Sequence, residues 1–526
     1  MNKNTILFLA FSALTIFVWS FFIAPQKQRQ QQPQVKQEQV EEKRRSSSDL
    51  QSEPISLKSA DTKTLKENIK IEEEEFNIET EKYKASFSNR GAAVLSWSIK
   101  EKNGEWIDLV LPQAAPVMAN FPGSNYKIVS KSNEKIVFEH VSHEGWKITK
   151  TYLLSPDSYM HNLNITLEKI NEESSLPRIE LEWGPGIGTD LKEMKENISV
   201  TRVIAYTAAK PGKLKKLKKE AEQAALFRWA ALDNRYFLAA FIPEKSIDFD
   251  QITPSRIDKK HPYSMTLTAV APKDSEKKEY SINFYLGPKG YAYLKTYDLG
   301  LEKAVDFGFF GFLSKIAFAV LNFFHGLTGN FGWAIIILTV ILQILLMPLT
   351  LKSLKSAAAM KRVQPMIKEI QEKYKGNPQR LNAEMLNIYK TQKVNPLGGC
   401  LPMLLQLPIF WAFFQMLRNS YELRNEGWIL WVKDLSAADQ FMHFGAYNLN
   451  LLPLIMGLGM FFQQKMTAAT SDPTQKKIMY IMPVVFTLMF WTFPSGLVLY
   501  WLTNSVISMI EQYFIIKKDE AKVKHV

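Results

Sequence analysis

Apolar positions are distributed unevenly along this chain of 526 residues, and they follow two different patterns. The first 25 residues and the part after residue 300 contain long, nearly unbroken apolar runs, whereas the segment between them contains short runs separated by polar residues. Runs of about 20 apolar residues are typical of helices that cross a bilayer, and short alternating runs are typical of β-strands in a water-exposed domain. The pattern therefore predicts a membrane protein with one large domain outside the bilayer.

The first apolar run extends from Thr5 to Ile23 and is preceded by Lys3. Its length suits a membrane span, whereas a cleaved signal peptide has a shorter apolar core and a small-residue cleavage site, which the sequence Phe21 to Pro25 lacks. We interpret residues 1–24 as an uncleaved transmembrane anchor, with a cleaved signal peptide as the alternative. Residues 25–71 are rich in Gln, Glu, Lys and Ser, and this composition predicts a disordered tether.

Residues 72–300 contain short β-branched and aromatic runs that are bounded by turn residues. Many such runs with little helical periodicity indicate antiparallel sheets, so we expect an all-β sandwich domain. One segment, from Lys213 to Phe227, has a helical pattern instead. The clearest expected strands are Ala85 to Ile99, Lys135 to Val141, Trp146 to Leu154, His161 to Leu167 and Tyr280 to Leu286.

Residues 301–326 are mostly Phe, Leu, Ile and Ala, with Lys315 and Asn322 on a narrow polar stripe. This amphipathic pattern predicts a helix that lies in the membrane interface. A helix of a protein core is the alternative interpretation.

Five further apolar segments lie within residues 327–516 and predict a membrane-embedded α-helical bundle of five spans. Lys and Arg are concentrated in the loop of residues 352–393, in a second loop and in the tail of residues 517–526, and this excess marks the cytoplasmic side. The resulting topology places both termini in the cytoplasm and the β domain on the other side of the membrane. The expected spans are Phe331 to Leu351, Pro396 to Leu417, Leu449 to Phe462, Ile478 to Phe493 and Gly496 to Ile510.

The cytoplasmic segment 352–393 has two apolar stripes with alternating spacings of three and four residues, separated by the turn Gly376-Asn377-Pro378. This pattern predicts an antiparallel helical hairpin that the stripes hold together. The stripes consist of Met360, Val363, Ile367, Ile370 and Tyr374 before the turn, and of Leu381, Met385 and Ile388 after it.

A dispersed set of polar residues occupies the expected spans. A polar group that faces lipid without a partner is costly, so these side chains should face one another or a hydrated cavity. Hydrogen bonding that only holds the helices together is the alternative. The set consists of Thr339, Gln343, Gln406, Tyr500, Thr503 and Asn504.

Composition narrows the classes of function. The formal net charge of +13 would suit a nucleic-acid-binding protein, but in a membrane protein it fits the basic cytoplasmic loops. The single cysteine, Cys400, excludes an intramolecular disulfide. The sequence contains no HExxH, Walker or GxSxG motif, so we expect no enzyme activity, no metal site and no cofactor.

Motifs in both halves of the chain carry a family resemblance. In the membrane half they are Asn395 to Cys400, Leu404 to Phe410, Trp431 to Leu435, Asp472-Pro473 and Phe493 to Tyr500. In the outer domain they are Asn89-Arg90-Gly91, Trp146 to Leu154, Trp229 to Pro243 and Gly287-Pro288. These motifs resemble the YidC family of membrane protein insertases, whose Gram-negative members have a large periplasmic domain.

The resemblance implies an inner-membrane insertase and chaperone with a polar groove that is open to the cytoplasm and to lipid but closed on the outside. It also implies nascent membrane proteins as clients, cooperation with the Sec translocon, and contact with the lipid bilayer. The hairpin of residues 352–393 would be the first contact for an arriving client, and the basic tail would add at most a weak attraction to the ribosome. The groove residues implied in this sequence are Thr339, Gln343, Gln406, Tyr500, Trp501 and Asn504.

One position departs from the family pattern. The family usually has an arginine that faces the groove from the span that corresponds to Phe331 to Leu351. The matching residue in this sequence is Gln343. A glutamine keeps the groove polar, but it offers no positive charge to an acidic client tail.

Two other functions remain open from the sequence alone. A secondary transporter would also place polar residues in its spans, but it predicts internal repeats and paired intramembrane charges, and neither is visible in the sequence. A membrane-anchored sugar-processing enzyme is the second alternative, because the outer domain of the family resembles the sandwich of sugar epimerases. That function would need converging acids and bases, which a sequence cannot display.

Overall fold

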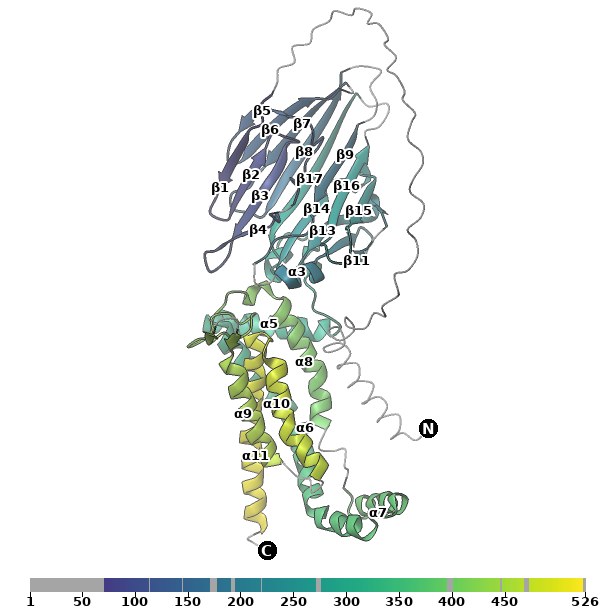
Figure 1. Ribbon diagram of the computed structural model, residues 1–526, viewed down its shortest axis with the longest axis vertical. Helices are drawn as coiled ribbons and strands as arrows, with labels where there is room; N and C mark the ends of the chain where they lie inside the picture. Colours follow the sequence, from purple (N-terminus) through teal and green to yellow (C-terminus); the bar gives the residue numbers. More distant parts are fainter. Residues whose placement is uncertain are drawn as a thin grey trace, which may run out of the picture. The chain divides into compact units, whose positions relative to one another are not determined.

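The computed structural model describes residues 71–112, 114–143, 145–170, 177–190, 194–218, 220–270, 276–394, 401–444, 447–467 and 473–523. The expected anchor of residues 1–24 and nearly all of the expected tether lie outside this part of the chain. Within the described residues, a β domain comes first in the sequence and a group of helices follows it (Figure 1).

The largest sheet of the β domain has nine strands. They are β5 (Lys127–Lys131), β6 (Lys135–Val141), β7 (Trp146–Leu153), β8 (Met160–Lys169), β10 (Arg202–Thr207), β11 (Leu214–Leu217), β13 (Phe227–Asp233), β14 (Phe237–Pro243) and β17 (Lys277–Pro288). Their order across the sheet is β11-β10-β13-β14-β17-β8-β7-β6-β5, and all described neighbours are antiparallel.

Two sheets of four antiparallel strands accompany it. The first has the sequential order of β1 (Glu75–Glu79), β2 (Tyr83–Ser88), β3 (Ala93–Lys100) and β4 (Trp106–Asp108). The second runs in the order β12 (Glu222–Gln223), β15 (Gln251–Ser255), β16 (Ser264–Val270) and β9 (Arg178–Trp183).

All three sheets contribute to one apolar core. Along β8, Leu163, Ile165 and Leu167 are buried while the residues between them are partly exposed, which is the period of two that a strand imposes. Trp97 of β3 and Leu267 of β16 belong to the same buried cluster. The prediction of antiparallel sheets packed around a common core is therefore confirmed.

The segment from Lys213 to Phe227 is not a helix, which corrects the sequence prediction. It contains β11, β12 and the short 3-10 helix η1 (Ala224–Leu226). β11 pairs with β10 at the edge of the large sheet, with Leu217 buried and the neighbouring lysines exposed. Sheet pairing at this edge outweighs the helix propensity of a Lys- and Leu-rich segment. A helix that the sequence analysis missed, α3 (Met194–Val200), precedes this region.

The expected strand Ala85 to Ile99 is in fact the hairpin of β2 and β3. The chain turns between them at Gly91, whose φ of +68° lies in the left-handed region that favours glycine. Periodicity alone did not reveal this turn, because β-type residues flank it on both sides.

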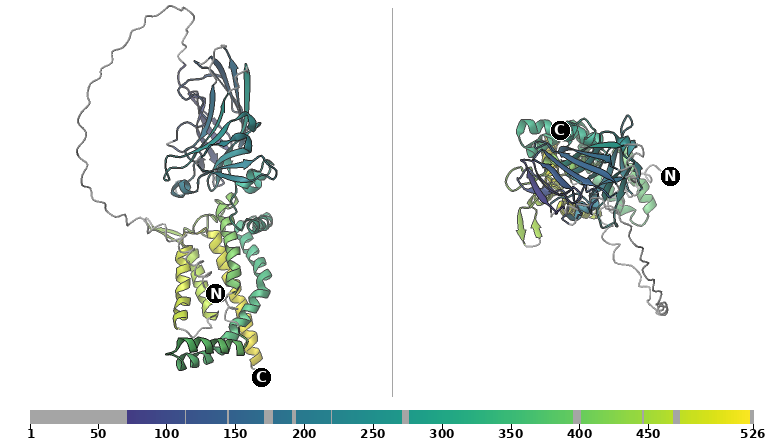
Figure 2. Two further views of the ribbon diagram at one scale, coloured as in Figure 1. Left: turned by 90° about the vertical axis from the view of Figure 1, so that its right-hand side faces the viewer. Right: turned by 90° about the horizontal axis from the view of Figure 1, so that it is seen from above.

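The other described elements belong mainly to the helical part. They are η2 (Ser246–Asp248), α4 (Tyr291–Lys295), η3 (Leu301–Ala304), α5 (Gly311–Thr328), α6 (Phe331–Lys373), α7 (Pro378–Thr391), α8 (Leu401–Asn419), η4 (Tyr421–Leu423), β18 (Met442–Phe444), β19 (Tyr447–Leu449), α9 (Leu451–Thr467), α10 (Pro473–Phe490) and α11 (Ser495–Val523). Each expected span overlaps one of the helices α6, α8, α9, α10 and α11, which run alongside one another (Figures 1 and 2). Residues 396–400 of the second expected span lie outside the described residues.

Among the described residues, two helical segments are long and apolar enough to cross a membrane: Gly311–Thr328 and Phe331–Ser353. Tyr480–Phe490 is a shorter apolar helix. The helix expected at residues 301–326 begins only at Gly311, because Gly308 adopts a φ of +72° and its N–H bonds to the Asp306 carboxylate. α5 runs across the direction of α6 and α8 rather than along it (Figure 1).

Two helices are longer than the sequence analysis expected. α6 continues from the expected span into the hairpin without a break, and it contains Pro348 and Pro365. α11 extends to Val523, so most of the expected tail of residues 517–526 is helical. The boundaries that we predicted between span, hairpin and tail therefore mark changes of composition, and the helices continue across them.

Candidate functional site

Thr339 and Gln343 lie one turn apart on α6, and both are buried within the helical part, with exposed fractions of 1% and 6%. The Thr339 hydroxyl donates a 2.7 Å hydrogen bond to the carbonyl oxygen of Ile335, so it is satisfied within its own helix. Residues four positions apart share one face of a helix. α6 therefore directs two polar side chains into an otherwise apolar interior.

A side-chain hydrogen bond joins α8 to α11. The Nε2 atom of Gln406 donates to the hydroxyl of Tyr500, a residue that is only 1% exposed. The Tyr500 ring also stacks on Phe413 of α8, with 4.6 Å between the ring centroids. The structure thus brings together two of the polar residues that were expected to line a common site.

Trp501 lies in an aromatic cluster instead. Its ring centroid is 5.5 Å from that of Phe410, 5.6 Å from that of Phe486 and 5.3 Å from that of Phe490. These residues belong to α8 and α10, so Trp501 packs three helices together. Its contacts indicate an apolar packing role, in contrast to the polar role of its neighbour Tyr500.

Asn504 lies one turn after Tyr500 on α11, and its Oδ1 atom is buried without a hydrogen-bond partner among the described residues. Buried polar atoms without a partner among the described residues also occur elsewhere on α11 and on other helices. Examples are Ser505 and Glu511 of α11, Gln464 of α9 and Gln364 of α6. The helical period could have identified Glu511, since it follows Asn504 by seven residues and so returns to the same face.

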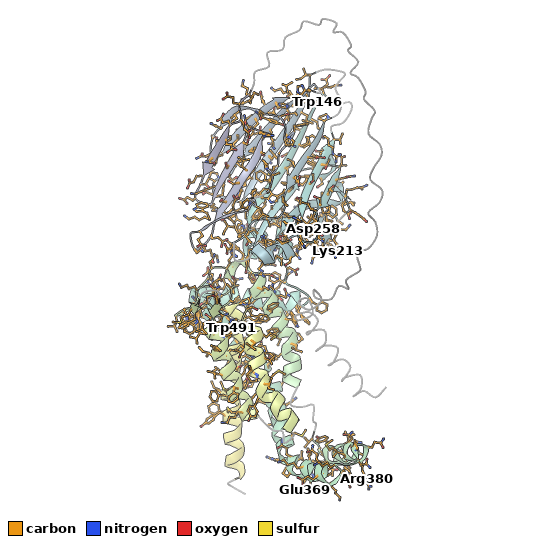
Figure 3. All side chains as sticks on the ribbon, in the orientation of Figure 1. Trp146, Lys213, Asp258, Glu369, Arg380 and Trp491 are labelled. Atoms are coloured by element: carbon orange, nitrogen blue, oxygen red, sulfur yellow. The ribbon has the colours of Figure 1, made fainter. Side chains whose placement is uncertain are left out.

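The expected hairpin is present as the end of α6 and the whole of α7, and Figure 3 labels Glu369 and Arg380 on its two arms. Val363 and Ile367 are buried in a small apolar cluster against which Met360 and Met385 pack. Leu381, the first residue of the expected second stripe, is partly exposed and is not part of that cluster. The Asn377 side chain accepts a 3.1 Å hydrogen bond from the backbone N–H of Arg380 and caps α7.

A buried ion cluster connects the segment after α8 with the β domain. The Arg424 guanidinium donates through Nε to Oε2 of Glu101 at 2.9 Å and through Nη2 to Oδ2 of Asp190 at 2.6 Å. It also lies 4.5 Å from the centroid of the Tyr236 ring. Burial raises the pKa of the Glu101 carboxyl, and the charge of Arg424 acts in the opposite direction.

A second ion network involves the segment that leads into α5. Arg202 of β10 donates to Asp233 at 2.8 Å and to Asp306 at 2.9 Å, and Lys289 donates to Asp233 at 2.8 Å. Burial alone would raise the pKa of Asp306, but the hydrogen bonds from Arg202 and from the Gly308 N–H, together with the charges of Arg202 and Lys216, outweigh it and hold that pKa below the ordinary 3.8. Neither network was predictable from the sequence, because its members are far apart in the chain.

Comparisons with known proteins agree with this arrangement of two parts. Residues 110–320 match the family described as the YidC periplasmic domain, and residues 323–522 match the family described as the 60Kd inner membrane protein. The motif from Asn395 to Cys400 lies outside the described residues, but it is within the second match.

Individual relatives cover the chain more fully. A protein of Endomicrobium trichonymphae named membrane protein insertase YidC is 68% identical over 528 residues, which is 100% of both chains. A protein of the same name from Syntrophus aciditrophicus is 34% identical over 478 residues, which is 85% of both chains. A solved structure of an active YidC insertase covers 84% of this chain and 92% of its own, with 21% identity and a TM-score of 0.39.

Proposed function

Since the chain belongs to the YidC family of membrane protein insertases, it inserts proteins into a membrane, and we propose that client segments pass along the polar side chains between α6, α8 and α11. The hydrogen bond from Gln406 to Tyr500 is the observation that carries this proposal. It places a polar pair between helices whose expected spans contain no Asp, Glu, Lys or Arg.

The physical reason concerns the polar tail that a client must move across hydrocarbon. Each backbone or side-chain polar group costs several kcal/mol when it enters hydrocarbon without a partner. Buried amide and hydroxyl groups on α6, α8 and α11 can exchange their present partners for groups of the passing tail. Burial of the client's own apolar helix in lipid is favourable, so the step requires neither a nucleotide nor a catalysed reaction.

The proposed topology has the N-terminal anchor and five further spans, with both termini in the cytoplasm and the β domain in the periplasm. Its support is the excess of Lys and Arg in residues 352–393 and in the C-terminal tail. In this arrangement α5 lies in the periplasmic membrane interface, where the exposed Phe312 and Phe323 of the helix, together with Phe309 just before it, contact lipid. The orientation of α5 across the other helices favours this role over that of a span.

The proposed partners are nascent membrane proteins, the lipid bilayer and the Sec translocon. The hairpin of α6 and α7 is the proposed first contact for a client, because it lies on the basic side where clients are synthesised. Attraction of the tail to ribosomal RNA is expected to be weak, since Asp519 and Glu520 offset part of its positive charge.

The experiment uses the purified full chain in liposomes and a single-span client with a short polar tail. Protection of the tail from external protease reports its insertion. Tyr500→Phe removes the hydroxyl and leaves Gln406 without this partner. The insertion rate should fall about fivefold, because the loss of one hydrogen bond costs ~1 kcal/mol. Tyr480→Phe is the matched control, because Tyr480 of α10 is 39% exposed. Equal insertion by the two variants would count against the polar path.

A further inference from the structure

Glu511 of α11 is an acidic residue to which neither the sequence analysis nor the proposed path assigns a role. Both of its carboxylate oxygens are buried, and neither has a hydrogen-bond partner among the described residues. α11 packs against α9, α6 and α8. On α9, the basic residue Lys465 has an exposed side chain and forms no ion pair with Glu511.

The helical period places Glu511 on the same face of α11 as the residues of the proposed path. Each residue of an α-helix advances by about 100°, so Tyr500, Asn504 and Glu511 lie within about 40° of one another. Tyr500 on this face bonds to Gln406, and Asn504 carries a buried oxygen without a described partner. Glu511 lies toward the basic end of α11, where the client would enter.

Most of the unpartnered atoms in this region are acceptors. They are Asn504 Oδ1, Gln464 Oε1 and the two oxygens of Glu511, whereas the Ser505 hydroxyl can donate or accept. An ionised Glu511 carboxylate has two acceptor oxygens and no donor. Rotation of the carboxylate therefore cannot replace a buried acceptor by a donor, as rotation of an amide can. A buried carboxylate without a partner is costly, and it persists where a cation or a function compensates for it.

The charge of the path is consistent with a cationic ligand. The expected spans contain no Lys or Arg, and Gln343 occupies the position where a groove arginine would otherwise be expected. Glu511 is the first ionisable residue that follows the last expected span. The expected spans therefore carry no positive charge that would repel a cationic tail.

We propose that Glu511 binds a positively charged group in the translocated tail of a client, either its N-terminal ammonium or a lysine side chain. An ammonium group has three donors and no acceptor, which complements the acceptors on α9 and α11. This proposal rests on the proposed function, because it assumes that client tails pass along this face of α11. It assigns to the chain a preference for cationic tails over neutral and acidic ones.

The test uses three clients whose tails differ only in two adjacent residues, which are Lys-Lys, Gln-Gln or Glu-Glu. Insertion is measured by protease protection in liposomes that contain the full chain and have no membrane potential, so that no external field acts on the tail. The Lys-Lys tail should insert about tenfold faster than the Gln-Gln tail, the factor for one charge-assisted hydrogen bond. Glu511→Gln should bring this ratio close to one, and the exposed control Glu372→Gln should leave the ratio unchanged.

A charge-reversed variant distinguishes loss of the binding site from misfolding of the protein. Glu511→Lys should favour the Glu-Glu tail over the Lys-Lys tail, a gain that a damaged protein cannot produce. A native ratio near one, or a Lys-Lys preference that survives Glu511→Gln, would overturn the proposal while leaving the polar path intact. If the native chain inserts the Gln-Gln tail no faster than protein-free liposomes do, then it is the proposed function that fails.

Discussion

The Nε atom of Arg424 lies 2.9 Å from Oε2 of Glu101, and this ion pair joins the segment after α8 to the turn between β3 and β4. The side chains of Arg424 and Glu101 are only 3% and 1% exposed. Asn425 donates a second hydrogen bond to Oε2 of Glu101 at 2.7 Å. Gln406 of the proposed path lies on α8, and Arg424 lies in the segment that follows α8. The ion pair therefore connects the β domain to the end of a helix of the proposed path.

We predict that Arg424→Met lowers the free energy of unfolding by about 3 to 5 kcal/mol, the usual cost of leaving one member of a buried ion pair without its partner. The measurement is denaturant unfolding of the purified chain in detergent, monitored by tryptophan fluorescence. Lys84→Met serves as the control, because it removes a surface ion pair with Glu79 whose members are 41% and 67% exposed. That control should change stability by less than ~1 kcal/mol. Similar losses for both variants would show that the buried pair has no special contribution.

A second prediction concerns pH. The folded state holds the pKa of Asp306 below its ordinary 3.8 through Arg202. A lowered carboxyl pKa means that the unfolded chain binds the proton more readily, so the stabilisation is complete above pH 3.8 and is lost as the pH falls through the folded value. Thermal unfolding between pH 5 and 3, with Asp306→Asn for comparison, measures this contribution. The native chain should lose more stability than the variant over that window, and parallel curves would contradict the assignment.

The hairpin core provides a third prediction. Ile367 is 7% exposed, whereas its neighbour Met366 on the same helix is 44% exposed. Ile367→Asp buries a charge in the cluster with Val363 and Met385, so it should separate α7 from α6 and reduce client insertion severely. Met366→Asp places the same charge in solvent and should retain most of the insertion activity. The protease-protection assay at equal protein levels compares the two, and an equal loss would indicate that surface charge, not hairpin integrity, controls activity.

Gln343 provides a fourth prediction. An arginine near the middle of a membrane costs about 2.5 to 3.5 kcal/mol on insertion scales, and glutamine avoids most of that cost. Gln343→Ala should therefore slow insertion modestly, because it removes hydrogen-bonding groups but no charge. Gln343→Arg should be tolerated and should increase the insertion of clients with acidic tails relative to neutral ones. If the native chain already prefers acidic tails strongly and Gln343→Arg changes nothing, a positive charge must come from elsewhere.

The sequence predicted features that depend on local periodicity. The alternation in β8, the stripes of the hairpin and the turn at Asn377 were all visible in the spacing of apolar and turn residues. The same reasoning failed at Lys213 to Phe227, because sheet pairing at an edge decides that segment and is not encoded in its own helix propensity. It also failed to separate β2 from β3, since one turn at Gly91 interrupts an otherwise continuous strand pattern.

The candidate site was predictable only in part. Gln406 and Tyr500 were identified as polar residues within apolar segments, and the structure pairs them. The contact between Glu101 and Arg424 could not be predicted, because it joins residues 323 positions apart that have no shared motif. Glu511 was overlooked because it lies just beyond the last expected span, where an acidic residue usually needs no explanation.

The proposed path along α11 is tested most directly by photocrosslinking. A photoreactive amino acid replaces either Asn504, which faces the interior of the helices, or Leu488 of α10, which is 68% exposed. A radiolabelled single-span client is stalled on the ribosome during insertion into membranes that contain either variant. The account predicts strong crosslinks to the client tail from position 504 and few from position 488. Crosslinks to the tail from position 488 alone would contradict it, because the client would then enter lipid without passing the polar side chains of α6, α8 and α11.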